Sequence, residues 1–153
     1  MEIVPMSLKQ MLVVGVSVVL LAACARVGKD FTARLDARQQ AYASAAGTPV
    51  NSFHFYGLWS WEPLSDEQLA VYTRPGEAWL LDLDGRCRNL LFTNRIAVTS
   101  GASVVAAKFD HVITGPGDAP CIIKQIRPVD IARLDSPQQG KPREIEEAQR
   151  QAK

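Results

Sequence analysis

Near the middle of the chain the sequence reads Leu69-Ala-Val-Tyr-Thr-Arg-Pro-Gly-Glu-Ala-Trp-Leu-Leu-Asp-Leu83. An apolar, β-branched run precedes Pro75-Gly76, a dipeptide that favours a tight turn, and a second apolar run follows it. This arrangement predicts a hairpin with strands over residues 69–73 and 77–83. Asp84-Gly85 predicts a further turn directly after the second strand.

Short runs typical of strands continue on both sides of this hairpin. Residues 52–56 alternate, with Phe53 and Phe55 on one face and His54 and Tyr56 on the other. Further strands are expected over residues 88–92, 95–99, 103–108, 109–114 and 121–126. Ser65 with Gln68 is expected to cap one helical turn. About six or seven short strands predict a small antiparallel sheet, a sandwich or a partly open barrel.

Residues 30–46 predict one amphipathic helix before the strands, because Phe31, Leu35 and Tyr42 recur at helical spacing. The helix is expected to cover a face of the sheet or an open barrel end, and binding of a partner is the alternative. The fold class is therefore α+β and mostly β, in a single globular domain over residues 30–135. Residues 136–153 are polar and predict a solvated tail, with a frayed helix as the alternative.

Length and composition limit the classes of function. The chain has 153 residues, of which 47% are hydrophobic and 22% charged, an ordinary balance for one globular domain. Lys and Arg number 17 against 16 Asp and Glu, which leaves a net charge of +1. With charges this evenly balanced, the protein has no broad basic surface, and we expect no nucleic-acid partner.

The first residues have the pattern of an export signal. Residues 11–21 form a short apolar run without charges, about the size of a signal-peptide core and about half of a bilayer span. Leu21-Ala-Ala-Cys24 follows and resembles the lipobox of bacterial lipoproteins. The resemblance implies a cleaved signal peptide over 1–23, a lipid such as palmitate on Cys24, and a tether over 24–29. A buried helix with an incidental cysteine is the alternative, and translation from Met6 instead of Met1 would remove the acidic Glu2.

The lipobox resemblance also implies a location. A lipidated Cys24 would hold the protein on a membrane in the envelope of a Gram-negative bacterium, facing the periplasm. In many such bacteria an Asp after the cysteine retains lipoproteins at the inner membrane. Ala25 stands at this position, and the outer membrane is therefore favoured over the inner one.

Cys87 and Cys121 remain as a pair once Cys24 carries the anchor. An exported protein meets an oxidising compartment, where a disulfide is the default, and its Cα atoms would lie about 4.4–6.8 Å apart. A redox pair prefers a Cys-x-x-Cys spacing. A zinc site would need both cysteines to converge with His54 and His111. We therefore predict a structural disulfide, with no metal and no cofactor.

The order of residues across the domain resembles a family of small proteobacterial envelope proteins, mostly lipoproteins, that is classed as a domain of unknown function. The resemblance covers about residues 46–134 and implies an exported, disulfide-bonded domain, without assigning catalytic residues. It is carried by Ala46-Gly-Thr-Pro-Val50, Trp61-Glu-Pro-Leu64, Ala78-Trp-Leu-Leu-Asp-Leu83, Cys87, Phe109-Asp110 and Cys121-Ile-Ile-Lys-Gln-Ile-Arg-Pro-Val-Asp130.

The sequence offers little recognisable chemistry. It has no Gly-x-Ser-x-Gly nucleophile motif, and Asp110 and His111 would point to opposite faces of a strand. Tyr56, Trp59 and Trp61 are candidate ligand-facing aromatics, for which a place in the core is the alternative. We therefore expect a non-enzymatic accessory or binding lipoprotein, with an envelope protein or a glycan as candidate partner. An envelope hydrolase with an unrecognised site is the alternative.

Overall fold

The computed structural model describes residues 28–134 and 142–150. The expected signal peptide and Cys24 lie outside these residues. The chain divides into two compact units, residues 1–37 and 38–153, and each is described by itself. Residues 28–37 of the first unit are helical, and the second unit begins with helical residues 38–45. Among the described residues, no helix is both long enough and apolar enough to cross a membrane.

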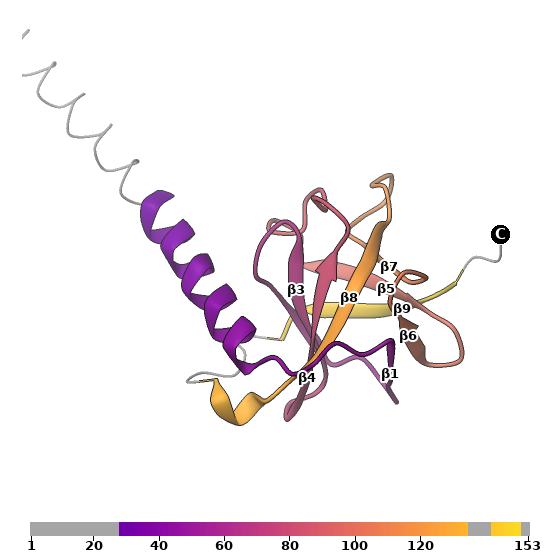
Figure 1. Ribbon diagram of the computed structural model, residues 1–153. Coiled ribbons are helices and arrows are strands. Elements are labelled where there is room, and N and C mark those ends of the chain that lie inside the picture. Colours follow the sequence, from indigo (N-terminus) through magenta and orange to yellow (C-terminus); the bar gives the residue numbers. More distant parts are fainter. Residues whose placement is uncertain (1–27, 135–141, 151–153) are drawn as a thin grey trace, which may run out of the picture. The chain divides into compact units, whose positions relative to one another are not determined.

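The second unit is built mainly of strands (Figure 1). Its elements are β1 (Ser52–His54), β2 (Ser60–Pro63), β3 (Gln68–Arg74), β4 (Glu77–Leu83), β5 (Arg95–Ser100), β6 (Val104–Ala106), β7 (His111–Ile113), β8 (Cys121–Val129), the 3-10 helix η1 (Ile131–Arg133) and β9 (Glu144–Gln149). β1 and β6 form a small antiparallel sheet, and the other strands form a seven-stranded sheet in the order β2-β3-β4-β8-β7-β5-β9. Its neighbours pair antiparallel except β5 and β9, which run parallel.

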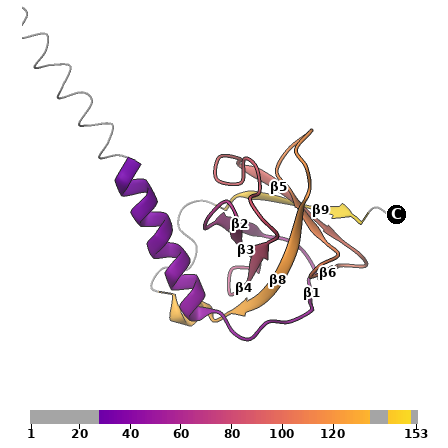
Figure 2. The ribbon, with the colours of Figure 1, turned by 45° about the horizontal axis from the view of Figure 1, so that its top comes forward.

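The seven-stranded sheet is nearly closed, because its two edge strands meet (Figure 2). Trp61 on β2 donates from Nε1 to the backbone oxygen of Glu144 on β9 at 3.0 Å. Next to it, the backbone N–H of Arg143 donates to the Ser60 hydroxyl at 2.9 Å. The Arg143 guanidinium carbon lies 5.1 Å from the centroid of the Trp61 ring. Side-chain contacts thus complete a ring of strands that backbone pairing leaves open.

Apolar side chains fill the interior of this sheet. The alternation of β3 sends Leu69 and Val71 inward and Ala70 and Tyr72 outward. The small β1–β6 sheet contributes to the same interior, and Phe53 stacks on Trp79 with ring centroids 4.8 Å apart. The buried members are Phe53, Phe55, Trp61, Leu69, Val71, Leu81, Leu83, Cys87, Leu90, Ile96, Val98, Val105, Val112, Ile123 and Ile126.

A second apolar cluster lies on the outer face of the sheet. Tyr42 and Ala45, from the helical residues of the second unit, pack against outward-facing side chains of β3, β4 and β8. The buried members are Tyr42, Ala45, Leu64, Ala70, Tyr72, Ala78, Leu80, Val129 and Leu134. The prediction that the helix covers a face of the sheet is confirmed for these residues.

Several local predictions are confirmed. The hairpin forms as β3 and β4, with its turn at Pro75-Gly76. Phe53 and Phe55 are buried, whereas His54 and Tyr56 are exposed. The fold is mostly β with a helical segment, as expected, and the open choice between architectures resolves to one nearly closed sheet plus a two-stranded one.

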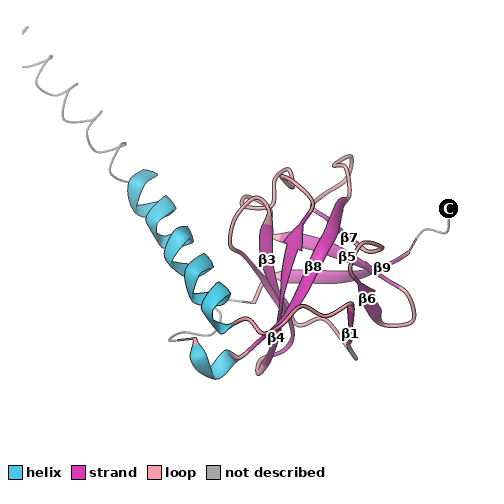
Figure 3. Ribbon diagram, viewed as in Figure 1, coloured by secondary structure: helices cyan, strands magenta, loops and turns pink. Residues whose placement is uncertain are grey.

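Three predictions of secondary structure are wrong. Residues 88–92 form turns in the loop between β4 and β5 (Figure 3), where Asn89 has a φ of 62° that a strand cannot accommodate. Ser65 accepts from the Glu67 N–H in a bend, with no helical turn. Residues 144–149, expected within a solvated tail, form β9, because β5 supplies a complete set of backbone partners. β2 was not predicted.

Candidate functional site

A row of polar side chains crosses the outer face of the sheet beside the second apolar cluster. Gln68 on β3 lies opposite Asp82 on β4 in the strand register, and its Nε2 donates to Asp82 Oδ1. Arg127 on β8 donates from Nη2 to both oxygens of Asp82, at 3.2 and 3.0 Å. About a fifth of each side chain of this ion pair is exposed. The carboxylate of Asp82 is thus held in place by both neighbouring strands.

This row borders a pocket of about 510 Å³, here named the β3–β4–β8 pocket. Its volume lies within the range of about 300–1,000 Å³ that is usual for small-molecule sites. Every residue of the lining is polar or charged except Leu83. The lining consists of Gln39, Ser65, Glu67, Gln68, Asp82, Leu83, Lys108, Lys124 and Gln125.

The pocket carries charged side chains that form no ion pair with the other residues that the structure describes. Lys124 lies on β8, and Lys108 lies in the turn between β6 and β7. Both are exposed, and neither forms an ion pair within the described part of the chain. The same holds for Glu67, whereas Asp82 is neutralised by Arg127. The site therefore presents two available ammonium groups and one available carboxylate.

The Gln68 side chain has unused hydrogen-bonding capacity. The residue is only 8% exposed, and its Oε1 is buried without a hydrogen-bond partner. In the same row, Arg127 Nε is also buried without a partner. Because nearly all buried polar atoms in proteins are paired, such atoms require an explanation, and a bound ligand or water is one.

A buried polar network joins the helix to β2 and β3. Glu62 on β2 accepts two hydrogen bonds from Arg38, Nε to Oε1 at 2.8 Å and Nη2 to Oε2 at 2.9 Å. Tyr42 donates to Glu62 Oε2 at 2.8 Å and shares a short hydrogen bond with the Tyr72 hydroxyl. Burial raises the pKa of both tyrosines, and the Glu62 charge adds to it. Both phenols therefore stay protonated, and the network is suited to fixing the helix on the sheet.

Asp110 anchors a second buried polar cluster. It is fully buried and accepts from the Thr99 hydroxyl at 2.8 Å and the Ala106 N–H at 2.7 Å. Arg150 donates to both of its oxygens, at 3.0 and 2.6 Å. Burial acts to raise the pKa of Asp110, but the hydrogen bonds from Arg150, Ala106 and Thr99 outweigh it and hold that pKa below its usual value. This cluster ties the end of β9 to the sheet.

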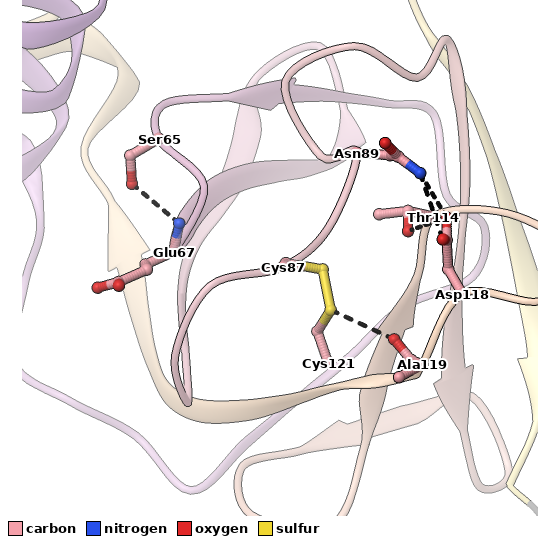
Figure 4. Close-up of a disulfide and its surroundings, with 8 residues drawn as sticks. All are labelled: Ser65, Glu67, Cys87, Asn89, Thr114, Asp118, Ala119 and Cys121. Atoms are coloured by element: carbon pink, nitrogen blue, oxygen red, sulfur yellow. Dashed lines mark hydrogen bonds between the residues drawn. A yellow bond between two sulfur atoms is a disulfide. The ribbon is translucent and has the colours of Figure 1, made fainter.

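The predicted proximity of Cys87 and Cys121 is confirmed. Their sulfurs are 2.01 Å apart and their Cα atoms 5.6 Å apart, which joins the β4–β5 loop to the start of β8 (Figure 4). Near the disulfide, Asp118 accepts from Asn89 Nδ2 at 3.0 Å and from the Thr114 hydroxyl at 3.0 Å. These polar contacts connect the same loop to the turn between β7 and β8.

The candidate aromatic residues do not form one surface. Tyr56 is fully exposed, and Trp59 is 39% exposed with its ring edge against Tyr72. Trp61 is fully buried in the interior, so a ligand-facing role for it is wrong, and the alternative of a core residue holds. Within residues 28–134 and 142–150, no group of three or more His, Cys, Asp or Glu residues is arranged to hold a metal ion.

The pocket residues escaped the sequence reasoning. Gln68, Lys108 and Lys124 come from three separate segments. The pairing of β3, β4 and β8 brings Gln68 and Lys124 together, and the backbone hydrogen bond from Lys108 to Ile123 adds Lys108. A signal did exist in the strands themselves. Gln68, Asp82 and Arg127 are polar residues in mainly apolar strands, which marks a polar patch on a sheet face.

Comparison with known protein families assigns the chain to one of them. A family model described as "Family of unknown function (DUF6491)" matches residues 7–151. The chain belongs to this family. The expected membership in a family of unknown function is thereby confirmed, and the DUF6491 match extends beyond residues 46–134 to include β9 and the whole lining of the β3–β4–β8 pocket. No curated protein and no solved structure matches the chain.

Proposed function

We propose that this DUF6491 protein is a lipoprotein of the bacterial cell envelope, anchored through Cys24, that binds a hydrophilic ligand without transforming it. The anchor rests on the Leu-Ala-Ala-Cys24 sequence behind an apolar run. A second acyl chain makes membrane attachment by lipids stable, whereas one chain gives only marginal binding. The disulfide between Cys87 and Cys121 is in keeping with an oxidising compartment.

The observation that carries the binding function is the β3–β4–β8 pocket. Its lining is polar, and it includes Gln68, whose buried Oε1 has no partner. Some small barrels hold their ligand inside the ring of strands. Here packed apolar side chains occupy that interior, and the outer face of the sheet is the better candidate for a polar ligand.

Substitution of Cys24 by serine tests the anchor. Metabolic labelling with a palmitate analogue should mark the wild-type protein but not Cys24→Ser, because the acceptor thiol is gone. The double variant Cys87→Ala with Cys121→Ala is the control, since it removes the two other cysteines together, leaves no unpaired thiol and keeps the lipobox intact, so it should still be labelled. Equal labelling of wild type and Cys24→Ser would contradict the lipoprotein assignment.

Site-specific photocrosslinking in intact cells tests the pocket. A photoreactive amino acid at Gln125, in the lining, should give an adduct that the same probe at the exposed Thr48 does not give. Mass spectrometry of the adduct would distinguish a glycan from an envelope protein. Identical behaviour of the two positions would argue against binding at this pocket.

A further inference from the structure

We infer that the β3–β4–β8 pocket takes a small hydrophilic molecule that carries an oxyanion, a carboxylate or a phosphate, between Lys108 and Lys124. The inference rests on the proposed function, in that it assumes this pocket binds a ligand. It goes further by assigning the charge of that ligand and the residues that recognise it.

The backbone holds the two lysines at the same wall. The backbone N–H of Lys108 donates to the carbonyl of Ile123 at 2.6 Å, which places Lys108 beside the residue that precedes Lys124. Lys108 has a φ of 69°, a conformation that a lysine rarely adopts, so the turn that presents it is specific. Both side chains then line one pocket, and neither forms an ion pair with an acidic group among the described residues.

The charge balance of the pocket favours an anion. Asp82 is paired with Arg127 and accepts from Gln68, so its negative charge is already balanced within the protein. Against two free ammonium groups stands the single carboxylate of Glu67. Two like charges focused in one concavity raise the local concentration of counter-ions, and an oxyanion is the ligand group that relieves their repulsion.

The rest of the lining favours a polar body for the ligand. Three glutamine amides, from Gln39, Gln68 and Gln125, and the Ser65 hydroxyl border the pocket. Among the described residues, no aromatic ring lines it, and Leu83 is the single apolar residue of the lining. Amide and hydroxyl groups of this kind suit ligand hydroxyl or N–H groups. A hydroxylated or amide-bearing molecule fits this lining, and an apolar molecule does not.

Four sugars with the same ring but different charges test whether the charge of the ligand, and not its shape, decides binding. Isothermal titration of the full-length lipidated protein in detergent micelles would compare glucuronate, glucose 6-phosphate, neutral glucose and cationic glucosamine. We expect at least one of the two anions to bind about fivefold or more tightly than glucose, with glucosamine weakest. The better anion of the two identifies carboxylate or phosphate as the favoured group. Rising salt should weaken anion binding because the lysines are exposed.

Two outcomes would overturn the inference. If glucose binds as tightly as both anions, the pocket binds a ligand but not through an oxyanion, so the proposed function survives and the inference fails. If none of the four binds, the inference fails as well, and the crosslinking at Gln125 decides the proposed function independently.

A pair of double variants assigns the effect to the two lysines. Lys108→Gln with Lys124→Gln should weaken anion binding by about 5- to 30-fold, as expected for the loss of two partly exposed ion pairs. The control is Arg74→Gln with Arg133→Gln, which removes the same charge at the end of β3 and in η1, the 3-10 helix that follows β8. Equal urea midpoints would show that both variants are folded. An unchanged affinity in the lysine variant, or an equal loss in the control, would overturn the assignment.

Discussion

Removal of the disulfide should lower the free energy of unfolding by about 4 kcal/mol. The perturbation is the double substitution Cys87→Ala and Cys121→Ala. The two residues are separated by 34 positions. For a closed loop of about 35 residues, the chain-entropy model gives about 13 cal/mol/K, or about 4 kcal/mol at 25 °C. Because single domains unfold at a cost of about 5–15 kcal/mol, this is a large share of the total.

Much of the local structure should survive this loss. The N–H of Cys87 donates to the carbonyl of Asp66 at 2.6 Å, and β8 keeps its pairing with β4 and β7. The substitution is therefore expected to destabilise the fold without rearranging it. Cys87 is 1% exposed, and alanine is preferred to serine there because it buries no unpaired hydroxyl.

Urea unfolding of the soluble chain begun at Ala25 provides the assay. The oxidised wild type, the reduced wild type and the double alanine variant would be compared by tryptophan fluorescence. Reductant should lower the wild-type midpoint and leave that of the variant unchanged. A difference below about 1 kcal/mol between oxidised wild type and variant would refute the reasoning, as would two free thiols in protein purified from the envelope.

Three further substitutions test the two buried polar networks and the contact between β2 and β9. The pKa of Asp110 is lower in the folded than in the unfolded state, so the ionised carboxylate stabilises the fold above about pH 4, and this stabilisation is lost as the pH falls through the folded pKa. In Asp110→Asn, the urea midpoint should therefore fall less steeply than in the wild type as the pH is lowered from about 6 to about 2. Arg38→Ala should cost about 3–5 kcal/mol in urea unfolding, because it strips Glu62 of a bidentate partner in a buried site, and a cost under about 1 kcal/mol would contradict this. Trp61→Phe removes the hydrogen bond to Glu144. If this side chain holds β9 against β2, amide hydrogen exchange should accelerate in β9 but not in β3.

Local signals in the sequence predicted the parts of the fold that local chemistry determines. Pro75-Gly76 fixes the turn between β3 and β4, and the alternation at Phe53 and Phe55 fixes which face of β1 is buried. Such patterns fail where a segment depends on a distant partner. β9, Glu144–Gln149, is largely polar and exposed, and it is a strand because β5 supplies its hydrogen bonds. No periodicity within β9 could have revealed that pairing.

The same distinction applies to the candidate sites. The Cys87–Cys121 pair was predictable because few cysteines leave few pairings. Trp59 and Trp61 would share a face of one extended strand, yet one is partly exposed and the other fully buried. Trp59 precedes β2 and contacts Tyr72 of the outer cluster, whereas Trp61 on β2 belongs to the interior cluster. Lys124 looked like an ordinary surface lysine. Lys124 becomes a candidate site residue only because the folded sheet places it in one pocket with Lys108 and with residues of β3 and β4.

Because β9 is the last described strand and lies at an edge of the sheet, the protein can be separated into two fragments just before it. Of the described strands it is the last to be synthesised, and until it is in place the sheet presents two unpaired edges, at β2 and β5. Exposed edges of this kind invite pairing with other strands. A chain shortened to residue 134 would keep both edges open, and a synthetic peptide of residues 142–150 carries all the β9 partners of β5 together with Arg143 and Arg150. We expect the two pieces to reassemble, and the change in tryptophan fluorescence, to which Trp61 beside β9 contributes, would report it.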